Sequence, residues 1–151
     1  MRLAEELAET CWLMYERTPT GLAAEIVVFH EQGAIDFSSS AEDSHSLLRP
    51  ETIESLFVLW RLTHDPKYRE RGWAIFEAFR AHCRVESGGY ASVESVREPE
   101  VRLRDKMESF WLSETLKYLW LLFSDDSVLP LDEWVFNTEA HPLPITRTPA
   151  S

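Results

Sequence analysis

Leu47-Leu48-Arg49-Pro50-Glu51-Thr52-Ile53-Glu54-Ser55, residues 47–55, is the stretch of sequence around which we expect the chain to fold. It predicts the start of a helix, because proline suits the first helical position, where a backbone N–H has no partner within the helix. Glu51 and Glu54 are three residues apart, so their carboxylates project from one face near the helix start. Acidic side chains at this place complement the helix dipole, and spacing alone favours that structural role.

The helix that follows, residues 53–62, carries apolar side chains on nearly every face. One apolar stripe consists of Ile53, Leu56, Phe57 and Trp60. Other faces of the helix carry Val58, Leu59 and Leu62. A helix that is apolar nearly all round is buried. We therefore expect the two carboxylates at its start to face an enclosed cavity, which favours a functional role.

The rest of the chain is predicted to be mainly helical. Apolar residues recur at helical spacing over residues 3–16, 67–83 and 105–123. Short extended segments are expected at residues 25–29, 84–86, 90–93 and 134–137, with a tight turn at 87–90. Residues 32–46 and 97–104 read as loops, and no regular structure is expected in the proline-rich tail from Pro142.

An internal repeat supports a helical architecture. Residues 54–60 align with residues 114–120, and residues 9–15 form a weaker third copy. Repeated helices of one design predict stacked helical hairpins, which bury a continuous core only where neighbours stack on them. We therefore expect this chain to be part of a larger helical ring.

Composition narrows the possible partners. The chain of 151 residues has a formal net charge of −11 and no basic cluster, which argues against nucleic acid and anionic membrane surfaces. We expect no signal peptide at its start and no membrane segment, because no apolar run is long enough. Cys11 and Cys83 could pair, each could be buried, or one could need a partner outside the chain.

Several acids could carry chemistry if the repeated helices line one cavity, because Glu51, Glu54 and Glu114 would then converge. Hydrolysis of a glycosidic bond needs one carboxyl group as acid and another as base or nucleophile. The aromatic residues, six Trp, eight Phe and four Tyr, suit sugar binding as well as a core. Salt bridges are the structural alternative, with three candidate partners: Arg49, Arg61 and Lys106.

A site for a hard cation is the second candidate, at residues 136–142. Calcium takes oxygen ligands that include backbone carbonyls and waters. Thr138 offers a hydroxyl and a carbonyl, and Glu139 offers a carboxylate, although an ordinary turn explains the same residues. A zinc site is disfavoured, because the five histidines show no paired spacing and there is no Cys-x-x-Cys.

Four motifs, in order along the chain, resemble the C-terminal motifs of class I α-1,2-mannosidases, glycoside hydrolase family 47. They are LRPETIES at residues 48–55, DKMESF at 105–110, SETLKYL at 113–119 and VFNTEAHP at 135–142. The resemblance implies that residues 1–144 form the C-terminal part of an (αα)7 barrel, and that residues 145–151 are a tail. The expected fold is therefore all-α, a partial α/α toroid with short β-hairpins in its loops.

The family trims high-mannose N-glycans by an inverting mechanism with bound calcium, and the resemblance implies a role for several residues. Glu51 resembles the general base, and Thr138 resembles the residue that binds Ca²⁺ directly. Three residues resemble the acids that hold calcium-bound waters: Glu54, Glu114 and Glu139. Four residues resemble substrate contacts: Arg49, Pro50, Phe110 and Glu25. Cys11 resembles one half of a disulfide whose partner lies outside this chain.

The resemblance also implies what these residues need from elsewhere. The proposed acid catalyst belongs to the N-terminal part of the family domain, so we expect this chain to be inactive without the remainder of the catalytic domain. The implied substrate is a high-mannose N-glycan in the endoplasmic reticulum, the Golgi lumen or outside the cell. Two alternatives remain: a non-catalytic relative that binds mannose glycans in glycoprotein quality control, and an unrelated α/α-toroid enzyme without calcium dependence.

Overall fold

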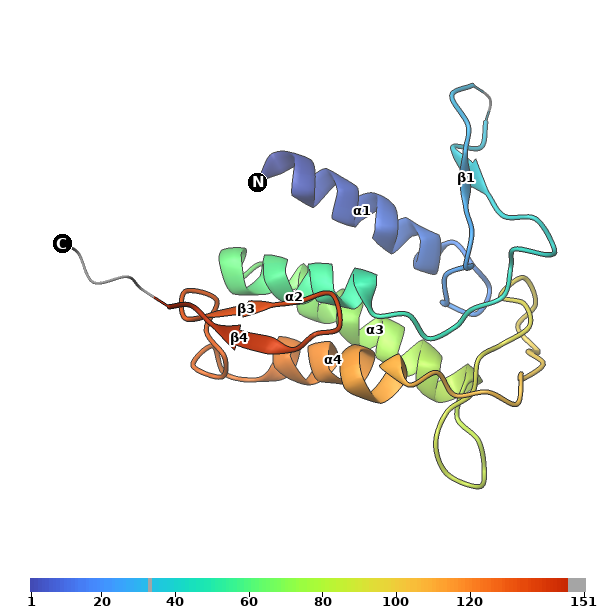
Figure 1. Cartoon of the computed structure of the whole chain (residues 1–151). Coiled ribbons are helices and arrows are strands. Elements are labelled where there is room, and N and C mark those ends of the chain that lie inside the picture. Colours follow the sequence, from blue (N-terminus) through green and yellow to red (C-terminus); the bar gives the residue numbers. More distant parts are fainter. Residues whose placement is uncertain (33, 147–151) are drawn as a thin grey trace.

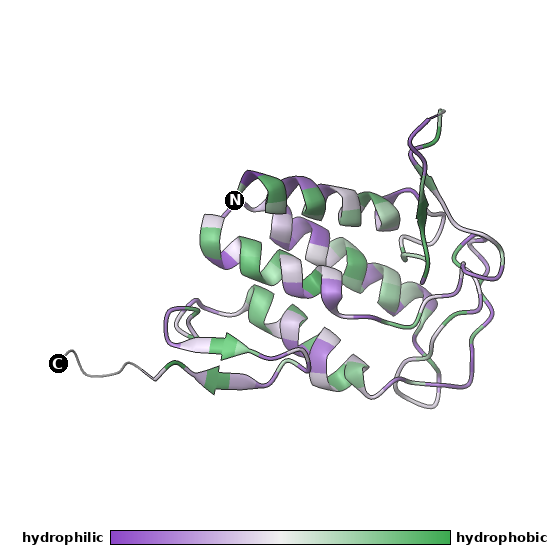
Figure 2. Cartoon of the chain, turned by 45° about the horizontal axis from the view of Figure 1, so that its top comes forward, coloured by the Kyte–Doolittle hydropathy of each residue, from purple (hydrophilic) through white to green (hydrophobic). Residues whose placement is uncertain are grey.

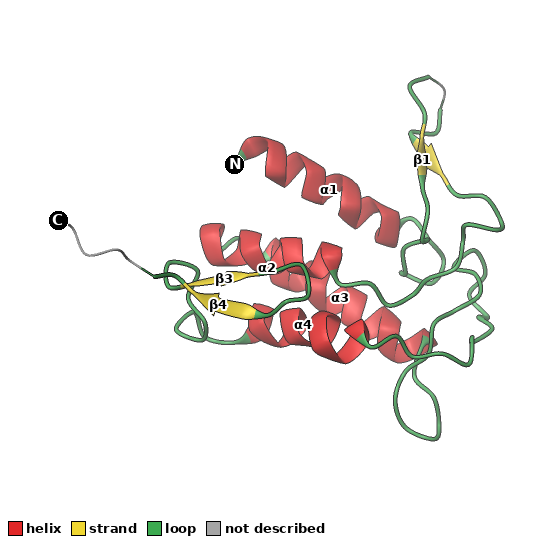
Figure 3. Cartoon of the chain, viewed as in Figure 1, coloured by secondary structure: helices red, strands yellow, loops and turns green. Residues whose placement is uncertain are grey.

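In the computed structural model of the chain, residues 1–32 and 34–146 are described. They form four α-helices, one π-helical turn and two small antiparallel hairpins (Figures 1 and 3). The helical elements are α1 (Arg2–Glu16), α2 (Glu51–Thr63), α3 (Lys67–His82), the π turn η1 (Trp111–Thr115) and α4 (Leu116–Phe123). The strands are β1 (Val28–Phe29), which pairs with β2 (Phe37–Ser38), and β3 (Trp134–Phe136), which pairs with β4 (Pro142–Pro144).

Helix α2 is the centre of the packing, since it contacts α1, α3 and α4, and α3 also packs against α4 (Figure 1). In the middle of α2, the Phe57 ring centroid lies 5.8 Å from that of Tyr118 on α4 and 5.7 Å from that of Phe136 on β3. Burial of each such ring stabilises the fold by roughly 1.5–3 kcal/mol. The β3–β4 hairpin is therefore fixed to both α2 and α4.

Two arginines cap the C-terminal end of α4. The Arg61 side chain is only 3% exposed, and its guanidinium donates to the backbone carbonyls of Leu121, Asp125, Asp126 and Val128. Arg69 on α3 donates to the Leu122 carbonyl at 2.7 Å and to the Ser124 carbonyl at 3.0 Å. The last carbonyls of a helix have no partner within it. Side chains from α2 and α3 therefore complete the hydrogen bonding of α4.

The helices predicted over residues 3–16 and 67–83 agree with α1 and α3 to within one residue at each end. The helix predicted over residues 105–123 is wrong in its first part, because helical backbone begins only near Trp111. The reason is non-local pairing: the Ser92 N–H donates to the Lys106 carbonyl at 3.0 Å, and the Arg104 N–H donates to the Ser92 carbonyl at 2.8 Å. This pairing, together with a tight bend in which the Lys106 N–H donates to the Arg104 carbonyl at 2.7 Å, keeps residues 104–106 out of a helix.

The prediction of no regular structure from Pro142 onward is also wrong, since residues 142–144 pair with β3. Prolines are tolerated in an edge strand whose N–H positions are not needed for pairing. The Ile145 N–H then donates to the Glu133 carbonyl at 2.7 Å and closes the hairpin. The end of the expected tail, residues 147–151, lies outside the described residues.

The outer helices leave large apolar side chains exposed. Leu3 and Leu7 on α1 are 68% and 58% exposed, and Trp120 on α4 is 60% exposed. Figure 2 shows such apolar segments on the helix that begins at the N-terminus, at one edge of the helical layer. Exposed apolar surfaces of this kind mark contact sites. In the part of the chain that the structure describes, no helix is both long and apolar enough to cross a membrane.

Candidate active site at the start of helix α2

Four carboxylates from three separate segments converge at one end of the helical layer. Glu51 and Glu54 lie in the first turns of α2, Glu114 lies in η1, and Glu139 lies in the turn between β3 and β4. Burial raises the pKa of the Glu114 carboxyl, and the charges of Glu51, Glu139 and Glu54 raise it further. Glu114 therefore lies close enough to each of the other three carboxylates to be repelled by it, an arrangement that favours a bound cation.

Arg49 connects the remaining predicted site residues around Glu51. Its Nε and Nη2 atoms each lie 2.6 Å from Oε1 of Glu25, and its Nη1 atom lies 3.8 Å from Oε1 of Glu51. The guanidinium carbon lies 5.5 Å from the centroid of the Phe110 ring. Arg49 thus brings two carboxylates and an aromatic face together, whereas Pro50 is buried beneath them.

The expectation that α2 is buried all round and opens into an enclosed cavity is wrong. Leu62 is 54% exposed, and the Glu51 side chain is 64% exposed. Glu51 instead borders a cavity of about 120 Å³ between α1 and the start of α2, lined also by Tyr15, Glu25 and Arg49. Glu51 is therefore a largely exposed residue at the rim of a small cavity.

The backbone on both sides of the site adopts left-handed conformations at residues other than glycine. Leu48, just before Arg49, has a φ of 66°, and Ala140, just after Glu139, has a φ of 57°. Both residues are completely buried. Such conformations cost about 1–3 kcal/mol and persist only where the surroundings enforce them. Here side chains from the start of α4 bind the carbonyls of both residues.

The turn that carries Thr138 is shaped by Asn137. The Asn137 side-chain oxygen accepts the N–H of Glu139 at 3.0 Å and the N–H of His141 at 2.8 Å. This leaves Thr138 and Glu139 exposed at the tip. Sequence reasoning gave Asn137 no role, although asparagine is favoured in turns because its side chain can bond to the backbone two residues on.

Cys11 and Cys83 do not pair with each other in the described chain. Cys11 is half-buried on α1, and Cys83 is buried just after α3. Burial raises the pKa of the Cys83 thiol to about 12, so this thiol is unreactive at neutral pH. The disulfide implied for Cys11 stays a prediction.

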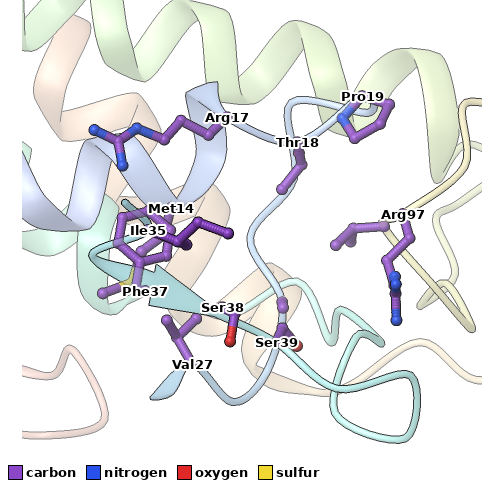
Figure 4. A pocket seen from close by; sticks show the side chains of 12 residues that line it. Met14, Arg17, Thr18, Pro19, Val27, Ile35, Phe37, Ser38, Ser39 and Arg97 are labelled. Atoms are coloured by element: carbon purple, nitrogen blue, oxygen red, sulfur yellow. The ribbon is translucent and has the colours of Figure 1, made fainter. Parts of the chain in front are cut away.

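A second pocket, of about 400 Å³, lies between the C-terminal end of α1 and the β1–β2 hairpin. Figure 4 shows Met14, Ile35 and Phe37 together on one side of it and Arg97 on another. The described residues that line it include two arginines but no carboxylate. Since glycoside hydrolysis normally requires a pair of carboxyl groups, this pocket is not the candidate active site.

We predict that Glu114→Gln stabilises the metal-free chain near pH 7, raising the melting temperature by up to a few degrees. The raised pKa of Glu114 means that its contribution to stability is present at low pH and is lost as the pH rises through the folded-state pKa. The neutral amide avoids that loss. Melting curves should be measured between about pH 3 and pH 8, which covers the range where carboxyl groups titrate. The melting temperatures of the variant and of wild type should converge at low pH. Glu133→Gln, an exposed change outside the cluster, should leave the curves unchanged.

The family model of glycosyl hydrolase family 47 matches residues 1–145 of this chain. A mannosyl-oligosaccharide 1,2-alpha-mannosidase of Arabidopsis thaliana is 57% identical over 162 residues, which cover 97% of this chain and 26% of that protein. The endoplasmic reticulum mannosyl-oligosaccharide 1,2-alpha-mannosidase of Homo sapiens is 56% identical over 155 residues, covering 99% of this chain and 22% of that protein.

A solved structure of alpha-1,2-mannosidase from Trichoderma reesei superimposes with a TM-score of 0.84 at 31% identity, over 93% of this chain and 33% of that one. This likeness confirms the predicted fold, an all-α partial α/α toroid with short hairpins. The chain spans only about a quarter of the length of the curated relatives it matches. The match over nearly all of its residues shows that this chain belongs to glycosyl hydrolase family 47, a family of glycosidases.

Proposed function

We propose that this chain forms the base-containing and cation-binding part of a calcium-dependent, inverting mannosyl-oligosaccharide 1,2-α-mannosidase that trims high-mannose N-glycans. Residues 1–144 would be the C-terminal part of its catalytic domain. The observation that carries the proposal is the convergence of Glu51 with the carboxylates of Glu54, Glu114 and Glu139, beside the turn that presents Thr138. The family relationship supplies the reaction to which this geometry is suited.

Glu51 is proposed as the general base. In an inverting glycosidase, a carboxylate takes a proton from water on the face of the sugar opposite the leaving group. The Glu51 side chain is exposed where a sugar would approach, and Arg49 lies 3.8 Å from it on one side. At 3.8 Å this contact is an ion pair without a hydrogen bond, so the carboxylate oxygens stay available to water.

The residues around Thr138 fit a calcium ion. Calcium prefers oxygen donors and readily keeps waters as ligands. The exposed Thr138 supplies a hydroxyl and a carbonyl, and Glu54, Glu114 and Glu139 supply carboxylates whose mutual repulsion a cation would relieve. Bound calcium would orient sugar hydroxyls and water. Among residues 1–32 and 34–146, no three acidic, His or Cys side chains are arranged as direct ligands of one metal. The proposal requires none, because waters would intervene.

Phe110 and Arg49 are proposed as the floor of the mannose subsite. An aromatic face suits the C–H face of a sugar ring, and the Arg49 guanidinium, whose carbon lies over the Phe110 ring at 5.5 Å from its centroid, provides hydrogen-bond donors beside it. Glu25, held by Arg49 at 2.6 Å, offers carboxylate oxygens to sugar hydroxyls. Pro50 is buried, so we propose that it shapes this floor from below.

The remaining part of a catalytic domain is proposed as the principal partner. The chain matches less than a third of each relative, and its exposed apolar helix faces are suited to further helices. The general acid would come from that part, so the 151 residues by themselves are expected to release no mannose. The relative from Homo sapiens is named as an endoplasmic reticulum enzyme, which supports a location in the secretory pathway.

A chimera tests the proposal. In it, this chain replaces the matching region of the Arabidopsis thaliana relative, which is 57% identical. We expect the chimera to release mannose from a high-mannose N-glycan with inversion at the anomeric carbon, and to lose activity with a calcium chelator. A folded chimera that binds the glycan without turnover would instead support a non-catalytic role in quality control. Turnover by the isolated chain would refute the requirement for a partner.

We predict that Thr138→Ala in the chimera weakens calcium binding by at least about tenfold, the usual scale for changes at metal sites. The substitution removes the hydroxyl but keeps the backbone carbonyl. Calcium titrations of activity should therefore shift to higher concentrations, and saturating calcium should restore part of the rate. Thr146→Ala, a change to an exposed threonine beyond β4, is the control and should not shift the titration. An unshifted titration for Thr138→Ala would contradict the assignment.

A further inference from the structure

We propose that Thr115, Lys117 and Tyr118, at the junction of η1 and α4, are positioning residues that hold the two other segments of the site, the start of α2 and the β3–β4 turn, in register. The inference rests on the proposed function, because it concerns how the cation-binding acids and the Thr138 turn are kept in place. Each of the three side chains makes one hydrogen bond to a different residue, 23 to 67 positions away in sequence.

Lys117 holds the turn that carries Thr138. Its Nζ atom donates to the Ala140 carbonyl at 2.9 Å, and the Ala140 N–H donates to the Asn137 carbonyl at 3.0 Å. Ala140 is completely buried and has a φ of 57°, so its backbone is held in a conformation that alanine seldom adopts. Lys117 is the single charged residue in the α4 sequence LKYLWLLF. The Lys117 side chain is half-buried, and this bond engages one of the three donors of its ammonium group.

Thr115 holds the segment that leads into Glu51. Its side chain is completely buried, and its hydroxyl donates to the Leu48 carbonyl at 2.6 Å. Leu48 has a φ of 66° and directly precedes Arg49 and Pro50. The bond therefore fixes the direction in which the chain enters α2, and with it the direction of the Glu51 side chain.

Tyr118 holds one of the acids itself. Its hydroxyl donates to Oε1 of Glu54 at 3.2 Å, and its ring packs against both Phe57 and Phe136, which also contact each other. Burial, followed by the negative charge of Glu54, raises the pKa of the Tyr118 hydroxyl, so the hydroxyl remains a donor at neutral pH. One Glu54 oxygen is thereby engaged, and the carboxylate is held in one orientation toward the other acids.

A left-handed backbone and a bound carbonyl occur together on both flanks of the site, and the donors at both flanks come from residues 115–117. A helix that served only to fill the core would need apolar side chains at these positions. At the junction of η1 and α4, three polar side chains instead form hydrogen bonds to residues of the candidate site. Groups of this kind, which orient metal-site residues without binding the metal, commonly change metal affinity by about 10- to 100-fold when removed.

Lys117→Met in the full 151-residue chain tests the inference, since it removes the donor but keeps the length of the side chain. Isothermal titration with Ca²⁺ should show an affinity about tenfold or more below wild type, and Lys117→Arg should restore most of it. Hydrogen exchange should become faster in peptides that cover residues 134–144, while the melting temperature changes little. Lys67→Met, at the start of α3, is the matched control and should bind Ca²⁺ like wild type.

The outcomes separate the inference from the function on which it rests. If wild type binds Ca²⁺ and Lys117→Met binds it equally well, the positioning role is wrong and the proposed calcium site stands. If wild type binds no Ca²⁺, the proposed site fails, and exchange in residues 134–144 still decides whether Lys117 holds the turn. Tyr118→Phe provides a second variant with almost no change in volume, and it should weaken Ca²⁺ binding without unfolding the chain. Unchanged affinity in Tyr118→Phe would remove Tyr118 from the proposal.

Discussion

Glu51→Gln in the chimera is expected to lower kcat by about 10²- to 10⁴-fold, the range that a general base contributes. The amide has nearly the same shape as the carboxylate and can keep its place 3.8 Å from Arg49, but it cannot accept a proton from water. Glycan binding should be retained, so KM should change far less than kcat. Initial rates of mannose release across a range of glycan concentrations measure both.

Calcium dependence separates the base from the acids that surround it. Glu54→Gln and Glu114→Gln are expected to weaken Ca²⁺ binding, so excess calcium should recover part of their activity. Glu51→Gln should gain nothing from excess calcium, because its defect is in proton transfer. Glu70→Gln, an exposed change on α3, serves as the control for the loss of one charge. Activity of Glu51→Gln within about threefold of wild type would exclude it as the base.

Arg61→Ala is expected to destabilise the chain by about 2–5 kcal/mol, because it leaves the part-buried carbonyls of Leu121 and Val128 without this donor, and an unsatisfied buried polar group costs about 1–3 kcal/mol. The side chain is 3% exposed, donates to four backbone carbonyls at the end of α4, and has its Nε 3.3 Å from Oδ1 of Asp126. Its guanidinium carbon also lies 4.9 Å from the Phe57 ring centroid. A small domain has only about 5–15 kcal/mol of stability in total. Much of the chain should therefore unfold at moderate urea concentration.

Urea unfolding followed by far-ultraviolet circular dichroism measures this loss. Arg80→Ala is the matched control, because Arg80 is exposed and pairs with Glu77, at 2.6 Å on the same helix. Exposed pairs of this kind contribute about 0.2–1 kcal/mol. The loss of stability in Arg61→Lys should lie between the losses in Arg61→Ala and Arg80→Ala, since an ammonium group cannot reach four carbonyls at once. A loss below about 1 kcal/mol for Arg61→Ala would show that water replaces the arginine at the end of α4.

The elements that could be predicted from sequence are those whose stability is local or strongly patterned. Helices α1 and α3 follow from apolar residues at helical spacing. The non-helical backbone of residues 104–106 and the strand β4 could not be predicted, because both depend on pairing with distant backbone, at Ser92 and at β3. Short-range patterns carry no information about such pairing.

The candidate site could likewise be predicted from sequence only in part. Helical spacing and the internal repeat are enough to bring Glu51, Glu54 and Glu114 toward one another, but their roles come from the family resemblance. Lys117 and Tyr118 were not predicted, because their partners lie 23 and 64 residues away. A lysine within an otherwise apolar helix was the available signal for the first of them. The catalytic, calcium-binding and substrate-binding roles stay predictions until the variants are measured.

The arginine caps on α4 have a consequence for the order in which the chain folds. An isolated helix of eight residues is too short to be stable in water. Its terminal carbonyls are bound by Arg61 and Arg69, so α4 becomes stable only after α2 and α3 have docked against it. Glu114, Lys117 and Tyr118 are carried by η1 and α4 and acquire their positions at that same step. We therefore expect the acids of the site to come together late in folding, after α2 and α3 have docked.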